Sequence, residues 1–229
     1  MKSPWLWSQR WSDLLFQHWP VDPAVLRPLV PPALNIEEFG GTAWVAVAPF
    51  RITRMRFRGV PLPPFGSPEM NVRTYVTDGR RSGVWFLSLD AGSRFFVSAG
   101  RALYRLAYVH ADIRVGREGH LVRYNSARPD GTTYAATYQP AGVPSRPEPG
   151  SFDHWCVERY RLFAGGTGSG LREAEIFHRP WELMPATVTL GRNDMLSVHG
   201  ITPCGPPAPP RMALPLDVRI WLPRRLGRA

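Results

Sequence analysis

The sequence predicts a mainly β (α+β) protein in which a curved antiparallel sheet closes into a barrel or cone, accompanied by a few short helices. Three observations lead to this fold class. The 25 Pro and 21 Gly among 229 residues shorten helices and multiply turns. Polar and apolar residues alternate with period two over much of the chain, as in strands. The connections between these runs are too short for parallel crossovers, and closure removes exposed sheet edges.

Two short helices are predicted. Asp22 is suited to cap a helix that begins at Pro23, and Pro28 is expected to end it. A second helix is predicted over residues 93–106, because Ser93 is suited to cap it and apolar residues follow at helical spacing. Both are too short to dominate the fold.

The remaining predicted elements are strands, over residues 14–18, 42–52, 71–77, 84–90, 108–115, 120–126, 132–139, 159–164, 172–177, 188–190 and 216–222. The runs at 71–77 and 84–90 form a predicted hairpin around a glycine-containing turn, and the runs from 108 to 139 form a predicted antiparallel meander. Loops are predicted at 61–68, 140–150 and 202–215, and the Gly-rich segment 165–170 is expected to be a flexible hairpin loop.

Size and hydropathy predict one globular domain over residues 1–229. A chain of 25.8 kDa with 44% hydrophobic residues can bury a large core. Its longest apolar stretch, 43–50, is far shorter than the roughly 20 residues of a membrane-spanning helix. The N-terminus has no apolar segment typical of a signal peptide. We therefore expect a cytoplasmic protein without a membrane partner.

The net charge of +10 raises the question of nucleic-acid binding. Lys2 is the sole lysine, and the arginines are spread evenly along the chain, which favours a compositional bias over a binding stripe. We predict no nucleic-acid partner, and binding to nucleic acid stays an alternative that rests on charge alone. Cys156 and Cys204 are expected to be reduced. No metal and no cofactor are predicted, since ligand spacings and phosphate-loop motifs are missing from the sequence.

Alternation gathers polar side chains on one face of two predicted strands. These are Asn71, Arg73, Tyr75 and Thr77 on the first strand, and Tyr108, His110, Asp112 and Arg114 on the second. Such a face meets either bulk water, which is the default, or a polar cavity. The cavity alternative is favoured by the chemistry of the residues, because Tyr, His and Arg supply the donors and titratable groups of a small-molecule site.

Several segments resemble a known family. They are WSDLLFQHWPVDPAVLRPLVPP at 11–32, NVRTYV at 71–76, VWFLSLDA at 84–91, ERY at 158–160 and HRPW at 178–181. These segments are similar to those of the YqjF-like family of uncharacterised bacterial proteins, within the acetoacetate decarboxylase-like superfamily. The resemblance spans roughly residues 5 to 223 and implies a curved antiparallel barrel or cone around a central cavity.

The resemblance also bears on chemistry. Counting from the Gly-Arg-x-Leu segment at 100–103, the Schiff-base lysine of the decarboxylase falls at Tyr108 and its neighbouring lysine at Val109. Since a phenol cannot form an iminium, decarboxylation through a Schiff base is not expected. The resemblance further implies that Arg10 and Glu69 lie near a substrate-binding arginine and a functional acid of that enzyme.

The leading hypothesis is a small-molecule ligand with a carboxylate or carbonyl group, bound in a cavity lined by Arg73, Tyr75, Tyr104, Tyr108 and His110. Arg73 would pair with the anion, and His110 and Tyr108 are the candidate catalytic groups, with His110 as acid or base. Whether the protein turns over its ligand is left open. The alternative is a non-catalytic structural or regulatory protein, a homo-oligomer that uses the proline-rich segment 202–215.

Overall fold

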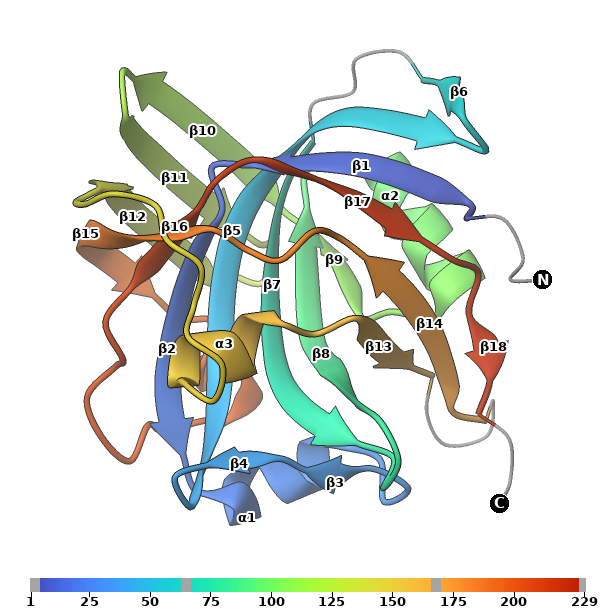
Figure 1. Cartoon of the computed structure of the whole chain (residues 1–229). Coiled ribbons are helices and arrows are strands. Elements are labelled where there is room, and N and C mark those ends of the chain that lie inside the picture. The colour runs from blue at the N-terminus through green and yellow to red at the C-terminus, as the bar shows by residue number, and fades with distance from the viewer. Residues whose placement is uncertain (1–4, 63–66, 166–169, 227–229) are drawn as a thin grey trace.

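The computed structural model describes residues 5–62, 67–165 and 170–226, and most of them lie in strands (Figure 1). The strands are β1 Trp7–Ser12, β2 Leu15–Val21, β3 Asn35–Ile36, β4 Glu38–Phe39, β5 Thr42–Phe57, β6 Val60–Pro61, β7 Ser67–Thr77, β8 Ser82–Ala91, β9 Tyr108–His110, β10 Asp112–Glu118, β11 Leu121–Ala127, β12 Thr133–Pro140, β13 Arg161–Ala164, β14 Arg172–Phe177, β15 Leu183–Asn193, β16 Arg211–Ala213, β17 Leu216–Ile220 and β18 Arg224–Arg225. The helices are α1 Pro23–Leu26, η1 Arg27–Leu29, α2 Arg94–Ala99, the π-helical turn η2 Gly100–Tyr104, α3 Phe152–Val157 and η3 Ser197–His199.

Seven strands close into a barrel, in the order β5, β7, β8, β13, β14, β17 and β1, with β1 returning to β5 (Figure 1). The neighbouring strands run antiparallel, except for the parallel pair β8 and β13. The predicted fold class, a curved and largely antiparallel sheet that closes into a barrel with a few short helices, is confirmed.

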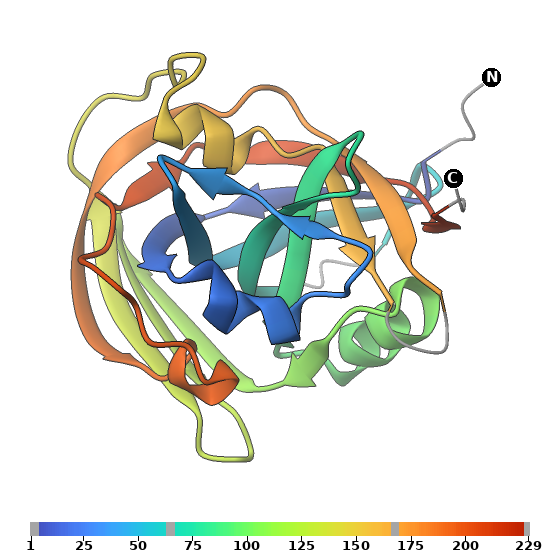
Figure 2. The same cartoon turned by 90° about the horizontal axis from the view of Figure 1, so that it is seen from below.

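A second wall continues from β5 through β2, β16, β15, β12, β11 and β10. It curves around the side of the molecule opposite α2 (Figure 2). Its last strand, β10, follows β9 in the chain, and β9 pairs with β8 in parallel. The strands β5, β7 and β8 therefore lie between two interiors.

The alternation along β5 shows how one strand serves both interiors. Ala46, Ala48 and Phe50 pack in the core of the seven-stranded barrel, whereas Val45 and Val47 pack in the core beneath the second wall. Successive side chains of a strand point to opposite faces. Both faces of β5 are largely buried over residues 43–50, so this part of the strand is continuously apolar, whereas polar residues alternate with apolar ones over residues 51–57.

Local sequence explains the two predicted helices. The Asp22 carboxylate accepts a hydrogen bond from the backbone N–H of Ala24 at 2.8 Å, at the start of α1. Ser93 caps α2 by accepting from the N–H of Phe96 at 3.5 Å. The helical segment that follows ends at Arg105, which adopts a left-handed conformation with φ of +56°. The predicted hairpin of β7 and β8 and the meander of β10, β11 and β12 are also found.

Several elements differ from the prediction. The predicted strand 108–115 is broken at Ala111 into β9 and β10. Strand β1 and helix α3 were not predicted, and β16 lies inside the predicted loop 202–215. Of the predicted loops 61–68 and 165–170, residues 63–66 and 166–169 lie outside the described part of the chain.

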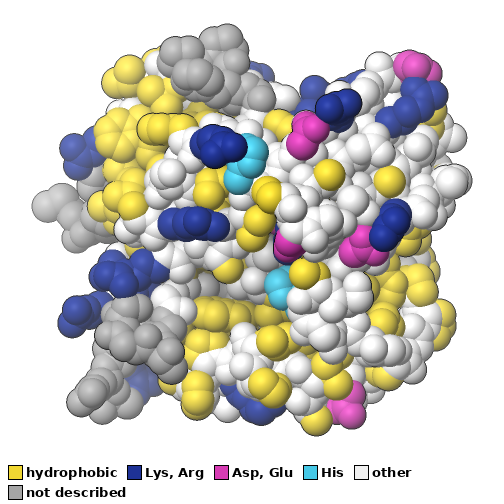
Figure 3. Space-filling model, turned by 180° about the vertical axis from the view of Figure 1, so that it is seen from behind, with side chains coloured by type: hydrophobic (Ala, Val, Ile, Leu, Met, Phe, Trp, Pro, Cys, Tyr) yellow, Lys and Arg dark blue, Asp and Glu magenta, His cyan; other side chains and the backbone are white. Residues whose placement is uncertain are grey.

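The distribution of surface charge and the length of the helices relate to the predicted absence of nucleic-acid and membrane partners. On the face drawn in Figure 3, several cationic side chains lie on the left side of the view, where no acidic side chain of the described residues is visible, and others lie among acidic ones on the right. The absence of a nucleic-acid partner stays a prediction. None of the described helices is long and apolar enough to span a bilayer.

Candidate functional site

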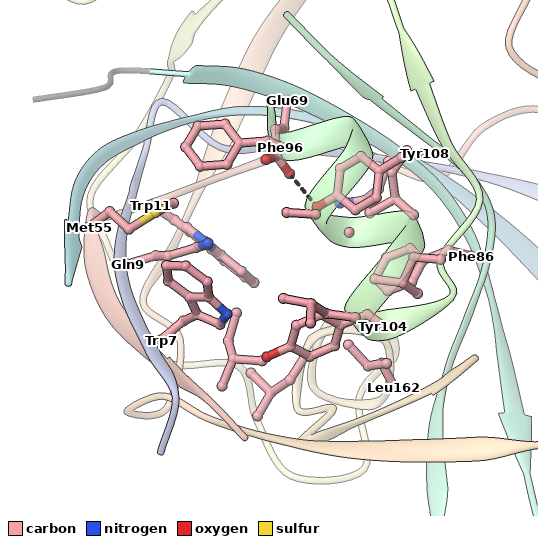
Figure 4. Close-up of a pocket in the computed structure, with 18 of the residues that line it drawn as sticks. Trp7, Gln9, Trp11, Met55, Glu69, Phe86, Phe96, Tyr104, Tyr108 and Leu162 are labelled. Carbon is pink, nitrogen blue, oxygen red and sulfur yellow. Dashed lines mark hydrogen bonds between the residues drawn. The ribbon is translucent and has the colours of Figure 1, made fainter. Parts of the chain in front are cut away.

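A cavity of about 100 Å³ lies inside the seven-stranded barrel, at the end covered by α2 and η2 (Figure 4). Its wall is mostly aromatic and aliphatic, with Trp7, Trp11, Phe50, Phe86, Phe96 and Leu162 among the lining side chains. The polar residues in the wall are Gln9, Glu69, Asn71, Tyr104 and Tyr108. An apolar enclosure with a few convergent polar groups is the usual form of a small-molecule site.

Strand β7 supplies two of the polar groups by alternation. Glu69 and Asn71 face the barrel and are 4% and 7% exposed, whereas Met70 and Val72 pack in the second core. The polar face predicted on this strand therefore meets the interior of the barrel and not bulk water. The default expectation of a solvated face is wrong for β7, because neighbouring strands and the helices cover both of its sides.

Glu69 and Tyr108 form a buried pair in the cavity wall. The Tyr108 hydroxyl donates to Oε2 of Glu69 at 3.2 Å (Figure 4). Burial raises the pKa of Glu69 to about 7, although the hydrogen bond from Tyr108 favours the carboxylate. Burial and the neighbouring Glu69 charge raise the pKa of Tyr108 well above its ordinary value. Glu69 is thus able to accept or release a proton near neutral pH.

The position of Tyr108 depends on Gly100 in η2. A Cβ atom built on Gly100 would lie 2.3 Å from Cε2 of the Tyr108 ring. The ring packs directly against the glycine backbone, so any larger residue there would displace it. Gly100 therefore sets the direction in which Tyr108 enters the cavity.

Tyr104, which also comes from η2, lies across the cavity from the Glu69–Tyr108 pair in Figure 4. Its side chain is 7% exposed, and its hydroxyl has no hydrogen-bond partner among the described residues. Burial raises the pKa of Tyr104 above its ordinary value, so the hydroxyl keeps its proton and remains a donor.

Arg73 and Tyr75 face the barrel interior but lie beyond this cavity, further along β7. The Arg73 guanidinium lies 5.3 Å from the Phe16 ring centre and 5.8 Å from the Tyr75 ring centre. The Tyr75 hydroxyl is hydrogen bonded to Nε2 of His18 at 2.7 Å. Burial and the Arg73 charge lower the pKa of His18 to about 3, so this imidazole is neutral. The expectation that Arg73 and Tyr75 share one cavity with Tyr108 is corrected, because neither lines it.

Two other predicted residues lie outside the cavity. Arg10 points to the outer side of β1, where its guanidinium pairs with Asp217 at 3.3 Å. His110 is half-buried at the end of β9 and is not part of the cavity wall. The predicted polar face breaks after His110, because the chain leaves the strand at Ala111, and Asp112 then lies exposed on β10.

The aromatic wall from β1 was missed by sequence reasoning. Trp7, Gln9 and Trp11 line the cavity on the face opposite Arg10, and the indole N–H of Trp11 donates to Gln9 Oε1 at 2.8 Å. The local signal is weak, because Trp7 and Trp11 are separated by three consecutive polar residues. A cavity built by β1 was not foreseen because the strand itself was not predicted.

The described residues contain no group of three or more His, Cys, Asp or Glu side chains arranged to hold a metal ion. Cys156 is buried and Cys204 is exposed, and both are free thiols. The side chains of the cavity wall can supply hydrogen bonds, apolar contact and proton transfer.

Sequence comparison identifies relatives of this chain. A model of the DUF2071 family, described as an uncharacterized conserved protein, matches residues 8–216. The uncharacterized protein YqjF of Bacillus subtilis is 38% identical over 202 residues, which cover 86% of this chain and 83% of YqjF. The predicted resemblance to the YqjF-like family is confirmed.

Solved structures share the fold. Acetoacetate decarboxylase from Legionella pneumophila matches with a TM-score of 0.70 at 11% identity, over 99% of this chain and 90% of that one. The enduracididine biosynthesis enzyme MppR, in complex with pyruvate, matches with a TM-score of 0.69 at 11% identity, over 99% and 92% of the two chains. An acetoacetate decarboxylase-like enzyme from Sphingomonas wittichii gives 0.66 at 15% identity, over 100% and 95%. These likenesses show an acetoacetate decarboxylase-like fold.

Proposed function

We propose that this chain, which belongs to the DUF2071 family of uncharacterized conserved proteins, binds a small organic ligand with a carbonyl or carboxylate group in the cavity beneath α2 and η2. The observation that carries the proposal is the buried Glu69–Tyr108 pair, which faces a mostly apolar cavity. MppR, which shares the fold, is described in complex with pyruvate, a small keto acid.

Different lining residues would contact the apolar and the polar parts of the ligand. Aromatic walls such as Trp7, Trp11 and Phe86 would cover the hydrocarbon part of the ligand. Tyr104 would donate its unpartnered hydroxyl to the carbonyl oxygen, and Glu69 would contact the other polar edge. Buried polar groups orient a ligand because leaving them unpaired is costly.

Binding would be non-covalent. Lys2 is the sole lysine of the sequence, and the positions counted from Gly100 hold Tyr108 and Val109, which supports binding without a Schiff base. If the protein turns over its ligand, Glu69 replaces His110 as the group that moves a proton, since its pKa near 7 suits both directions of transfer.

The proposal is tested by filling the cavity. Ala99 lines it, whereas Ala102, one helical turn away, is exposed and does not. We expect short ketones to raise the melting temperature of the wild type and of Ala102→Phe, but not of Ala99→Phe. Equal shifts in all three proteins would mean that the ligand binds outside this cavity. No shift in any of them would contradict the proposed binding.

Covalent chemistry is tested separately. Incubation with acetoacetate and borohydride, followed by intact mass measurement, should leave the mass of the protein unchanged. A stable adduct of one ligand per chain would overturn the non-covalent mechanism.

A further inference from the structure

Three polar groups in the cavity wall have unused hydrogen-bonding capacity. The Tyr104 hydroxyl and Asn71 Oδ1 are buried without a hydrogen-bond partner among the described residues. The Tyr108 hydroxyl donates a hydrogen bond to Oε2 of Glu69, and no described residue donates one to Oε1. A buried polar atom left unpaired costs free energy, and a bound molecule that supplies the missing partner removes that cost.

The unused atoms specify the polarity of that molecule. Oε1 of an ionised Glu69 and Oδ1 of Asn71 accept only, so each requires an N–H or O–H from the ligand. The Tyr104 hydroxyl keeps its proton and can donate to a carbonyl oxygen. A plain ketone satisfies Tyr104 alone, because it has no donor to offer.

Glu69 and Asn71 border the same cavity, so both acceptors are available to one ligand. Glu69 and Asn71 are two residues apart on one face of β7, which places their Cα atoms about 7 Å from each other. One nitrogen with two hydrogens can reach two acceptors, each at about 2.9 Å, when their side chains converge.

The charge of the wall also restricts the ligand. Among the described lining residues, Glu69 is the one carboxylate, and no Arg, Lys or His side chain takes part. The Arg73 guanidinium, at the next inward position of β7, instead packs over Phe16 and Tyr75. A carboxylate ligand would be buried beside Glu69 without a counter-ion, which is unfavourable.

We infer that the cavity selects a short, neutral primary carboxamide with a branched apolar tail, whose –NH₂ bridges Glu69 and Asn71 while its carbonyl oxygen accepts from Tyr104. This inference rests on the proposed function and names the ligand class of the same site. Since an apolar cavity of about 150 Å³ holds the six carbons of benzene, a cavity of about 100 Å³ encloses roughly four non-hydrogen atoms, and the end of the tail would extend to the exposed lining residues Phe95 and Leu103.

Three isosteric probes test the inference: 3-methylbutanamide, 4-methyl-2-pentanone and 3-methylbutanoate, which differ in one group beside the carbonyl carbon. Dissociation constants are measured by NMR titration of the ¹⁵N-labelled protein at pH 7.5. The amide should bind at least tenfold more tightly than the ketone, because its –NH₂ forms two hydrogen bonds that the ketone lacks, and one net hydrogen bond is already worth up to about a factor of ten. The carboxylate should bind most weakly.

Variants test which side chains cause the preference for the amide over the ketone. Asn71→Leu, of similar volume, should reduce the preference for the amide over the ketone by a factor of about five to ten, because it removes one of the two acceptors while Glu69 remains. Tyr104→Phe should weaken both probes to a similar extent. Asn125→Leu, at an exposed position of β11, is the control and should keep the wild-type preference. If Asn71→Leu does not fold, the ranking of the probes on the wild type still decides the inference.

The outcomes distinguish failure of the amide inference from failure of the proposed function. A ketone that binds as tightly as the amide, or a carboxylate that binds most tightly, overturns the amide inference while ligand binding in the cavity stands. Tightest binding of 3-methylbutylamine, added as a cationic probe, would likewise overturn it. If no probe perturbs the cavity resonances, both the inference and the proposed function fail.

Discussion

Replacement of Glu69 by Gln should change how the stability of the protein depends on pH. The pKa of this carboxyl is about 7 in the folded protein, against 4.5 for an ordinary glutamate. Below pH 4.5 the group is protonated in both states and contributes no difference. Between pH 4.5 and 7 the unfolded chain releases the proton while the folded protein retains it, so stability falls as pH rises.

The size of the effect follows from the displacement of the pKa. Each tenfold change in proton affinity is worth about 1.4 kcal/mol, so ionised Glu69 destabilises the folded protein by about 3 kcal/mol above pH 7. Gln has nearly the same shape and no charge. Glu69→Gln should therefore gain about 3 kcal/mol relative to the wild type between pH 4.5 and pH 8.5.

Urea unfolding at these two pH values measures the difference directly. Glu148→Gln, at an exposed glutamate, is the matched control and should follow the wild type at both pH values. A stability difference between wild type and Glu69→Gln that does not change with pH would refute the burial of an ionisable Glu69. Tyr108→Phe should move the transition to higher pH, because it removes a hydrogen bond that favours the carboxylate.

Two further predictions concern packing and buried charge. Gly100→Ala should displace the Tyr108 ring, since the added Cβ would lie 2.3 Å from it, and should destabilise the protein by about 1–3 kcal/mol in urea unfolding; an unchanged unfolding midpoint would contradict the close contact. Asp90→Asn should cost about 3–5 kcal/mol, because it leaves the buried Arg128 guanidinium, paired at 2.6 Å, without its counter-ion. Asp112→Asn, at an exposed ion pair, should stay within about 0.5 kcal/mol, and equal losses in both variants would contradict the difference in burial.

Elements with local signals were predicted from the sequence. The cap at Asp22, the cap at Ser93 and the turn between β7 and β8 depend on residues within a few positions of one another. Strand β1 was missed because long-range pairing with β5 and β17 holds it in place, and such pairing leaves little trace in a single sequence. Helix α3, with six residues, is too short to show a helical period.

The candidate site was predicted in part. Period-two alternation identified the inward face of β7 but does not tell which end of a barrel a residue reaches, so Arg73 was grouped with Tyr108. Glu69 was indicated by the family resemblance alone, since its unusual proton affinity arises from burial by residues distant in the chain. His110 was misplaced because the break at Ala111, whose N–H bonds to the Ala91 carbonyl, is a tertiary contact.

The shared position of β7 makes this strand intolerant of a change in length. Because its two faces serve different interiors, inserting one residue before Glu69 would exchange the environments of every following side chain. Met70 would then enter the cavity of the seven-stranded barrel, while the carboxyl of Glu69 would be driven into a compartment filled by Leu15 and Val47. Divergence of specificity among relatives is therefore expected to proceed by substitution along this strand, with insertions and deletions confined to the turns at its ends.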